Sequence, residues 1–88
     1  MAANLEDIKG WISRGKAEHQ DFLIVMCDTY DYDDYPVFVK GSQEECQKEY
    51  NALSRGGNMQ TVMEVYDIGA DIAPQLTKKR AFPSWLVR

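Results

Sequence analysis

Apolar side chains recur every three or four positions near the start of the chain, which is the spacing of one face of an α-helix. These positions are Leu5, Ile8, Trp11 and Ile12. Asn4 can cap the start of such a helix and Gly15 can end it, so the pattern predicts a helix over residues 4–15.

Two β-strands are expected next. Residues 22–27 are an unbroken apolar run, which is typical of a central strand that is covered on both faces. A second, short strand is predicted at residues 37–39, before Gly41. The polar and aromatic residues 28–36 would connect the two strands as a hairpin.

The chain then predicts a second helix and a third strand. Ser42 and Glu45 form a capping box that opens the helix, and Gly56 with Gly57 would end it. The apolar stripe of this helix is Cys46, Tyr50 and Leu53. Residues 59–68 carry apolar side chains at both odd and even positions, so both faces of the third strand are expected to be covered.

Beyond Gly69 the pattern predicts a short C-terminal helix and an apolar tail. Asp71 and Pro74 can open the helix, and the cations that follow suit its C-terminus. Residues 82–87 cannot form a regular helix around Pro83 and are too apolar for a free tail. They are expected either to pack on their own domain or to dock on another copy of the chain.

These elements predict one α+β domain over residues 1–88, in the order α-β-β-α-β with a short C-terminal helix or tail. The helix between the second and third strands is a crossover, and the right-handedness of such connections makes those two strands parallel. With the apolar first strand between them, the expected sheet is mixed and ordered 2-1-3, with the helices mainly on one face. The other face would be exposed, so we expect a homo-oligomer, and docking of the tail, residues 72–88, on another subunit is one of the two alternatives for that segment.

Composition and charge narrow the classes of function. The net charge of −4 argues against a general nucleic-acid binder, which would present a basic face. No apolar stretch approaches the roughly 20 residues of a membrane span, and charges interrupt the first apolar cluster, unlike a signal peptide. Cys27, Cys46 and the single His19 are too few for a structural zinc site. We therefore expect two reduced, buried thiols in a reducing cytoplasm, with no metal and no cofactor.

The acidic and aromatic residues 28–35 are the first candidate site. They contain an Asp-x-Asp pair, but the glycine and the distal glutamate of an EF-hand calcium loop are missing. Tyrosines offer a large contact area at a low entropic cost, so Tyr30, Tyr32 and Tyr35 could bind a ligand or a partner. The alternative is a solvated hairpin whose tyrosine rings cover the edges of the core.

Basic residues form the second candidate site. Arg55 precedes a glycine-rich turn that ends at Asn58, and its guanidinium with the exposed amides could hold a phosphate or a carboxylate. The turn is not a Walker motif, and the simpler alternative is a helix cap. The tail combines cations with aromatic rings, the two features that a nucleotide needs, although a solvated helix end is the alternative. The tail residues are Lys78, Lys79, Arg80, Phe82 and Trp85.

Two stretches of the chain resemble a family of small, uncharacterised proteins encoded by bacteriophages. These stretches are CDTYDYDDYPVFV, which begins at Cys27, and NMQTVMEVYD, which begins at Asn58, and the similarity covers most of residues 20–82. The resemblance implies a phage accessory protein that acts in the cytoplasm of the bacterial host. It brings no settled activity and therefore no functional residues.

Small phage proteins without catalytic motifs frequently counter host defence. The functional hypothesis is based on this common role of such proteins. The chain is expected to be a non-catalytic binder that sequesters a small anionic ligand, such as a nucleotide immune signal, between its subunits. The alternative is an acidic inhibitor that blocks a host defence protein, either by imitating nucleic acid or by capping a basic partner. An enzyme is not expected, because the sequence holds no catalytic constellation.

Overall fold

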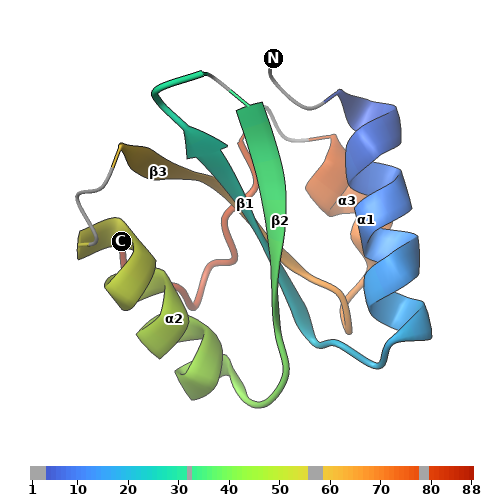
Figure 1. Ribbon diagram of the computed structural model, residues 1–88. Coiled ribbons are helices and arrows are strands. Elements are labelled where there is room, and N and C mark those ends of the chain that lie inside the picture. The colour runs from blue at the N-terminus through green and yellow to red at the C-terminus, as the bar shows by residue number, and fades with distance from the viewer. Residues whose placement is uncertain (1–3, 32, 56–58, 78–79) are drawn as a thin grey trace.

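The computed structural model describes residues 4–31, 33–55, 59–77 and 80–88. Its elements are, in chain order, α1 (Leu5–Ala17), β1 (Phe22–Asp28), β2 (Asp33–Val39), α2 (Gln43–Arg55), β3 (Gln60–Asp67) and α3 (Ile72–Leu76). The strands form one sheet in the order β2-β1-β3, and α1 and α2 lie on opposite sides of it (Figure 1). The α+β class and the strand order are as the sequence predicts. Within the described part of the chain, no helix has the length and apolar character to cross a membrane.

The sheet is antiparallel throughout, which corrects the expectation of a mixed sheet. β1 pairs antiparallel with β2 on one side and with β3 on the other. β2 and β3 therefore run in the same direction, as the crossover argument requires, but they are not neighbours. A mixed sheet would need two adjacent parallel strands, and the central position of β1 prevents that arrangement.

Both faces of the sheet are covered, so the expectation of helices mainly on one face was wrong. Successive residues of β1 point to opposite faces. Leu23 and Val25 lie in a cluster with α1, whereas Ile24 and Met26 lie in a cluster with α2. All four side chains are no more than 1% exposed. An apolar run of this kind is stable only when each face has its own cover, and an open sheet face therefore no longer motivates a homo-oligomer.

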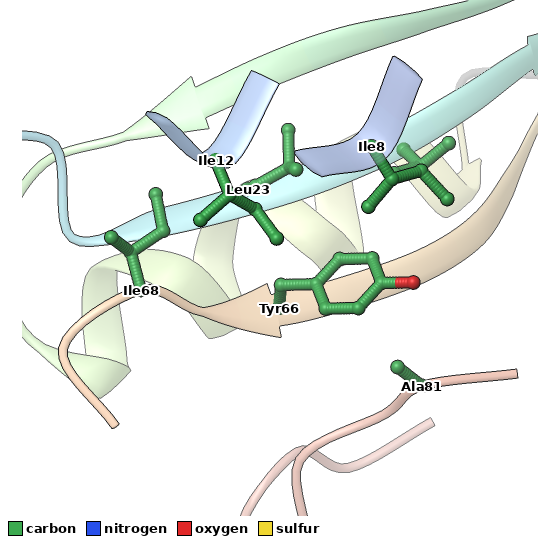
Figure 2. Close-up of a cluster of buried hydrophobic side chains, with 7 residues drawn as sticks. Ile8, Ile12, Leu23, Tyr66, Ile68 and Ala81 are labelled. Atoms are coloured by element: carbon green, nitrogen blue, oxygen red, sulfur yellow. The ribbon is translucent and has the colours of Figure 1, made fainter. Parts of the chain in front are cut away.

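The cluster on the α1 face is built around Tyr66 (Figure 2). Ile8 and Ile12 stand one helical turn apart on α1 and point toward Leu23 and the ring of Tyr66 (Figure 2). The hydroxyl of Tyr66 donates to the carboxylate of Glu64 on the same strand. Burial, and then the neighbouring Glu64 carboxylate, raise the pKa of Tyr66 above its usual range. A polar group inside this core is thus satisfied by its own strand.

The tail after α3 crosses the edge of β3 from one face of the sheet to the other. Ala81 belongs to the cluster on the α1 face, whereas Leu86 belongs to the cluster on the α2 face. At the crossing, the backbone N–H of Val65 donates to the carbonyl of Ala81 at 2.8 Å. Figure 1 shows the tail passing from the side of α3 to the end of α2. Of the two alternatives left open by the sequence, the structure has the tail on its own domain.

A side-chain amide of α2 holds the end of the tail in place. The Nε2 of Gln47 donates to the carbonyl of Val87 at 2.8 Å, and the N–H of Val87 donates to Oε1 of Gln47, also at 2.8 Å. The side-chain amide of Gln47 thus forms, with the backbone of Val87, the pair of hydrogen bonds that a residue of a neighbouring strand would form. The last residues of the tail are therefore fixed relative to α2.

β2 and β3 differ from their predicted forms for reasons that lie in the pairing. β2 begins at Asp33, four residues before the predicted start, and includes Pro36. A proline is tolerated there because β2 is an edge strand, where one row of N–H groups has no partner strand. In β3, a register shift makes Met63 an extra residue, so Val62 and Val65 both face α2. The bulge explains why an even and an odd position face α2, and cover on both faces explains why both parities are apolar.

α1 continues past Gly15, which corrects its predicted end. The start is as predicted, because Asn4 accepts from the N–H of Asp7 at 2.9 Å and the Asp7 carboxylate accepts from the N–H of Asn4. Gly15 is buried where the helix approaches the sheet. A Cβ there would lie 2.8 Å from Cδ1 of Ile68 and 2.9 Å from Cε1 of Phe38. The glycine is a contact residue and not a helix stop.

The two glycines of α1 therefore offer a matched test of this contact. Replacement of glycine by alanine raises helix stability by up to about 1 kcal/mol at either position. At Gly10 an added Cβ would have no other part of the fold within 4 Å. Gly10→Ala should stabilise the protein, while Gly15→Ala forces Phe38 and Ile68 to move. The difference between the two free energies of unfolding should be about 1–3 kcal/mol, the usual cost of overpacking. Urea denaturation of both variants measures it, and equal stabilisation would mean that α1 does not approach the sheet at Gly15.

Candidate functional site

The expected ligand-binding residues do not form one cluster. Tyr32, Asn58, Lys78 and Lys79 lie outside the described residues. The described ones lie at the β1–β2 turn and on β2, at the end of α2, and along the tail. Each place has its own geometry and charge.

The aspartates of the β1–β2 turn fold the turn itself. Asp28 accepts from the N–H of Tyr30 at 2.9 Å, and Asp31 accepts from the N–H of Asp33 at 3.2 Å. Such bonds from a carboxylate to the backbone two residues on are a common way to close a turn. They account for two of the aspartates without any ligand.

The tyrosines of the same segment have different surroundings. Tyr30 is 75% exposed at the turn. Tyr35 is half-buried against the cluster on the α2 face, and its hydroxyl bonds Oε1 of Gln60 on β3. The solvated-hairpin interpretation thus describes Tyr35 well, because its ring covers the core edge. It does not describe Tyr30, which belongs to neither hydrophobic cluster of the described residues.

Arg55 lies in a pocket of about 330 Å³ at the end of α2, which we call the arginine pocket. It is lined by Tyr50, Asn51, Ser54, Arg55 and Arg88. The Nε of Arg55 donates to the carbonyl of Asn51 at 3.3 Å. The guanidinium carbon of Arg88 lies 4.3 Å from the centroid of the Phe82 ring, a cation–π contact that orients the side chain. Two arginine residues therefore line one depression.

The sequence interpretation missed the partners of Arg55 in this pocket. The sequence pattern places Tyr50 only in the apolar stripe of α2, and it does not single out Arg88. The spacing of Tyr50, Asn51, Ser54 and Arg55 places them on adjoining faces of one helix end, which is a usable signal. No local signal brings Arg88 to that end, because its position depends on the path of the tail.

Phe82 and Trp85 lie in a second pocket of about 350 Å³, which we call the tryptophan pocket. It is lined by Gln43, Asp67, Ala70, Asp71, Gln75, Ala81, Phe82, Pro83, Ser84 and Trp85. Among these, the charged side chains are those of Asp67 and Asp71, and no described residue lines both pockets. The structure thus separates the stacking rings from Arg55. Arg80 is exposed and lines neither pocket.

The walls of the tryptophan pocket are held in place by an aromatic contact and by hydrogen bonds of Gln75. The Trp85 ring meets Phe22 of β1 edge to face, with 5.4 Å between the centroids. Gln75 of α3 accepts from the N–H of Asp67 at 2.8 Å and donates to the carbonyls of Asp67 at 2.9 Å and of Asp71 at 3.0 Å. The aromatic and acidic walls are therefore both fixed before any ligand arrives.

Both cysteines are free and buried, as expected. Cys46 of α2 is fully buried in the cluster on the α2 face. Burial, followed by the negative charges of Asp67 and Glu49, raises the pKa of Cys46 to about 12. Burial and a hydrogen bond with Asp34 raise the pKa of Cys27 as well. Neither thiol has the lowered pKa of a reactive cysteine.

In the described residues, no group of three or more histidine, cysteine, aspartate or glutamate side chains is placed to hold a metal ion.

Comparison with protein-family models, with curated proteins and with solved structures found no match to the chain.

The raised pKa of Cys46 predicts a specific dependence of stability on pH. The folded state keeps the thiol neutral, while the unfolded state ionises it near its usual pKa of 9. The contribution is fully present below pH 9 and is lost as pH rises toward 12. Between these values the free energy of unfolding of the wild type should fall more steeply than that of Cys46→Ala, by up to about 1.4 kcal/mol per pH unit. Parallel slopes in denaturant titrations from pH 8 to 11 would contradict a buried, neutral thiol.

Proposed function

We propose that the protein is a non-catalytic binding protein that holds a small anionic ligand in the arginine pocket. The observation that carries this proposal is the meeting of Arg55 and Arg88 in one pocket. None of the described residues that line that pocket is acidic. Within the described part of the chain, neither guanidinium pairs with a carboxylate. Their charge is therefore available to a ligand.

The chemistry of guanidinium groups defines the ligand class. A guanidinium presents several donors in a planar fork that matches the oxygens of phosphate and carboxylate groups. The hydroxyl of Ser54 and the amide of Asn51 add polar groups at the same wall. Because the whole chain has a net charge of −4, the attraction for an anion is local and should weaken as salt screens it.

A nucleotide is the anion that we propose to test first. Tyr50 adds an aromatic ring to the pocket, and stacking of one base contributes about 1–3 kcal/mol in proteins that bind single strands. The site lies within one chain, so a ligand does not need the subunit interface that the sequence hypothesis assumed. The role against antiviral defence in a bacterial cytoplasm follows from the resemblance to phage proteins and from no feature of the pocket.

Removal of either guanidinium should weaken binding of the anion. Arg55→Ala and Arg88→Ala should each lower the affinity for cyclic nucleotides or ADP-ribose by about tenfold or more, because a hydrogen bond to a charged group contributes about 1.5–3 kcal/mol. Isothermal titration calorimetry at low and moderate salt measures this loss. Arg14→Ala is the matched control, because Arg14 also lies over a phenyl ring, 4.9 Å from the centroid of Phe38, on the α1 face.

Three outcomes of the calorimetry would contradict the proposal. One is the absence of heat with every nucleotide and with inorganic phosphate. Another is equal loss of affinity in the Arg14→Ala control. The third is a loss in Arg80→Ala with none in the two pocket variants, which would move the anion site to the basic residues that the sequence favoured.

A second candidate function rests on the exposed tip of the β1–β2 turn. Tyr30 is 75% exposed there, and Asp31 and Asp33 beside it are exposed as well. A protruding ring among carboxylates suits contact with a basic protein surface. This is the acidic inhibitor of a host defence protein that the sequence left as the alternative.

Neutralising the turn tests that candidate. Asp31→Asn with Asp33→Asn should abolish capture of a bacterial partner by the tagged protein, while asparagine at position 31 keeps the oxygen that closes the turn. Asp34 is left unchanged because it is half-buried and bonds Cys27. The control is Glu6→Gln with Glu44→Gln, an equal loss of charge on exposed helix positions. A partner retained by the turn variant, or lost equally from both, removes the turn from consideration.

A further inference from the structure

The tryptophan pocket has a chemistry that the proposed anion site does not use. We infer that this pocket is a separate binding site for a small organic cation, an amine or guanidinium attached to an apolar body. The inference rests on the shape of the pocket, on its aromatic wall and on its two carboxylates. It does not depend on the arginine pocket.

The pocket has the size and construction of a small-molecule site. Its volume of about 350 Å³ lies within the range usual for ligand pockets. Residues from four parts of the fold form it, namely the start of α2, the end of β3 with the following turn, α3, and the tail. A depression built by several elements keeps its shape better than one within a single loop.

One wall of the pocket is aromatic and already positioned. Trp85, Phe82 and Pro83 line it together. The contact of Trp85 with Phe22, at 5.4 Å between centroids, anchors the indole to the central strand. The electron-rich face of an aromatic ring attracts a cation, and tryptophan does so most strongly. A ligand ring or alkyl chain can also pack on this wall.

The other wall is negatively charged. Oδ1 of Asp67 accepts from the N–H of Gly69 at 3.1 Å, and Oδ1 of Asp71 accepts from the N–H of Ala73 at 3.2 Å. These bonds fix both carboxylates and leave the second oxygen of each for a ligand. No cation of the described residues forms an ion pair with either aspartate.

This combination selects a cation with an organic body over the other ligand classes. A phosphate or carboxylate would meet two like charges, which disfavours it. A hard metal ion takes six or more oxygen ligands, and two carboxylates beside a tryptophan do not supply them. An ammonium or guanidinium group can reach the free oxygens of Asp67 and Asp71 while the rest of the molecule lies on Trp85. In that placement the charged group contacts the acidic wall and the apolar body packs on the aromatic wall.

Three probes that share one ring test the inference. Benzylammonium, benzyl alcohol and benzoate differ mainly in charge. Trp85 becomes the only tryptophan in a Trp11→Phe background, so its fluorescence reports the pocket. We expect benzylammonium to bind at least tenfold more tightly than benzyl alcohol, and benzoate to bind more weakly than either. Shifts of the Trp85 indole N–H in NMR spectra of the wild type provide a second readout.

Asparagine variants separate charge from structure. Asn at positions 67 and 71 keeps the oxygen that accepts from the backbone but removes the charge. Asp67→Asn with Asp71→Asn should reduce the affinity for benzylammonium at least tenfold and leave that for benzyl alcohol unchanged. Asp31→Asn, at the β1–β2 turn, is the control with an equal type of substitution and should change neither affinity. The single variants are measured as well, in case the double variant unfolds.

The outcomes of this experiment decide the inference clearly. Preference for benzylammonium that disappears with the two aspartates supports it, and Arg55→Ala should leave that preference intact. Equal affinities for benzylammonium and benzyl alcohol overturn it, as does a preference that survives both substitutions. Absence of a response from Trp85 to any probe at millimolar concentration also overturns it. A failure of nucleotides to bind has no bearing on these results, so the two proposals fail independently.

Discussion

The burial of β1 on both faces is the constraint on which the rest of the structure depends. Its side chains from Phe22 to Met26 are no more than 4% exposed, and they point alternately to the two faces of the sheet. Full burial of each such side chain contributes about 1.5–3 kcal/mol, a large share of the stability of a small domain. Neither helix alone can cover both faces, so α1 and α2 must lie on opposite sides. The antiparallel strands on either side complete the backbone pairing of β1.

This arrangement also determines where ligands can bind. α3 lies on the side of α1, while the last apolar residues are needed beside α2, so the tail has to cross the edge of β3 (Figure 1). The beginning of the tail, with Phe82 and Trp85, forms a wall of the acidic tryptophan pocket. Its end brings Arg88 to Arg55 in the basic arginine pocket. One segment thus contributes to two depressions of opposite charge.

Local signals in the sequence predicted the elements whose causes are local. The capping bonds of Asn4, the capping position of Ser42 and the apolar run of β1 lie within a few residues, and the structure has them as expected. The predictions were wrong where the tertiary position of a residue determines its local structure. Pro36 indicates a turn unless it lies on an edge strand, and Gly15 indicates a helix end unless a neighbouring strand leaves no room for a side chain. Neither condition can be read from adjacent residues.

The candidate sites show the same limit more strongly. The sequence singled out Arg55, Phe82 and Trp85, which all line pockets, because cations and aromatic rings are recognisable by type. It could not show that Arg88 lies beside Arg55, or that Asp67 lies beside Trp85. These neighbours depend on the crossing of the tail, which is set by contacts with β3 and α2. Residue type was therefore predictable, and charge environment was not.

The crossing of the tail has a further consequence for the behaviour of the protein in concentrated solution. An exposed strand edge is a template on which another chain can add a strand, and proteins avoid aggregation by obstructing such edges. On the outer edge of β3, the N–H of Val65 already donates to the carbonyl of Ala81. On the other edge, Pro36 lacks an N–H and aspartates begin the strand. Both margins of the sheet are thus obstructed by different means, and intermolecular growth of the sheet is disfavoured although the sheet is small.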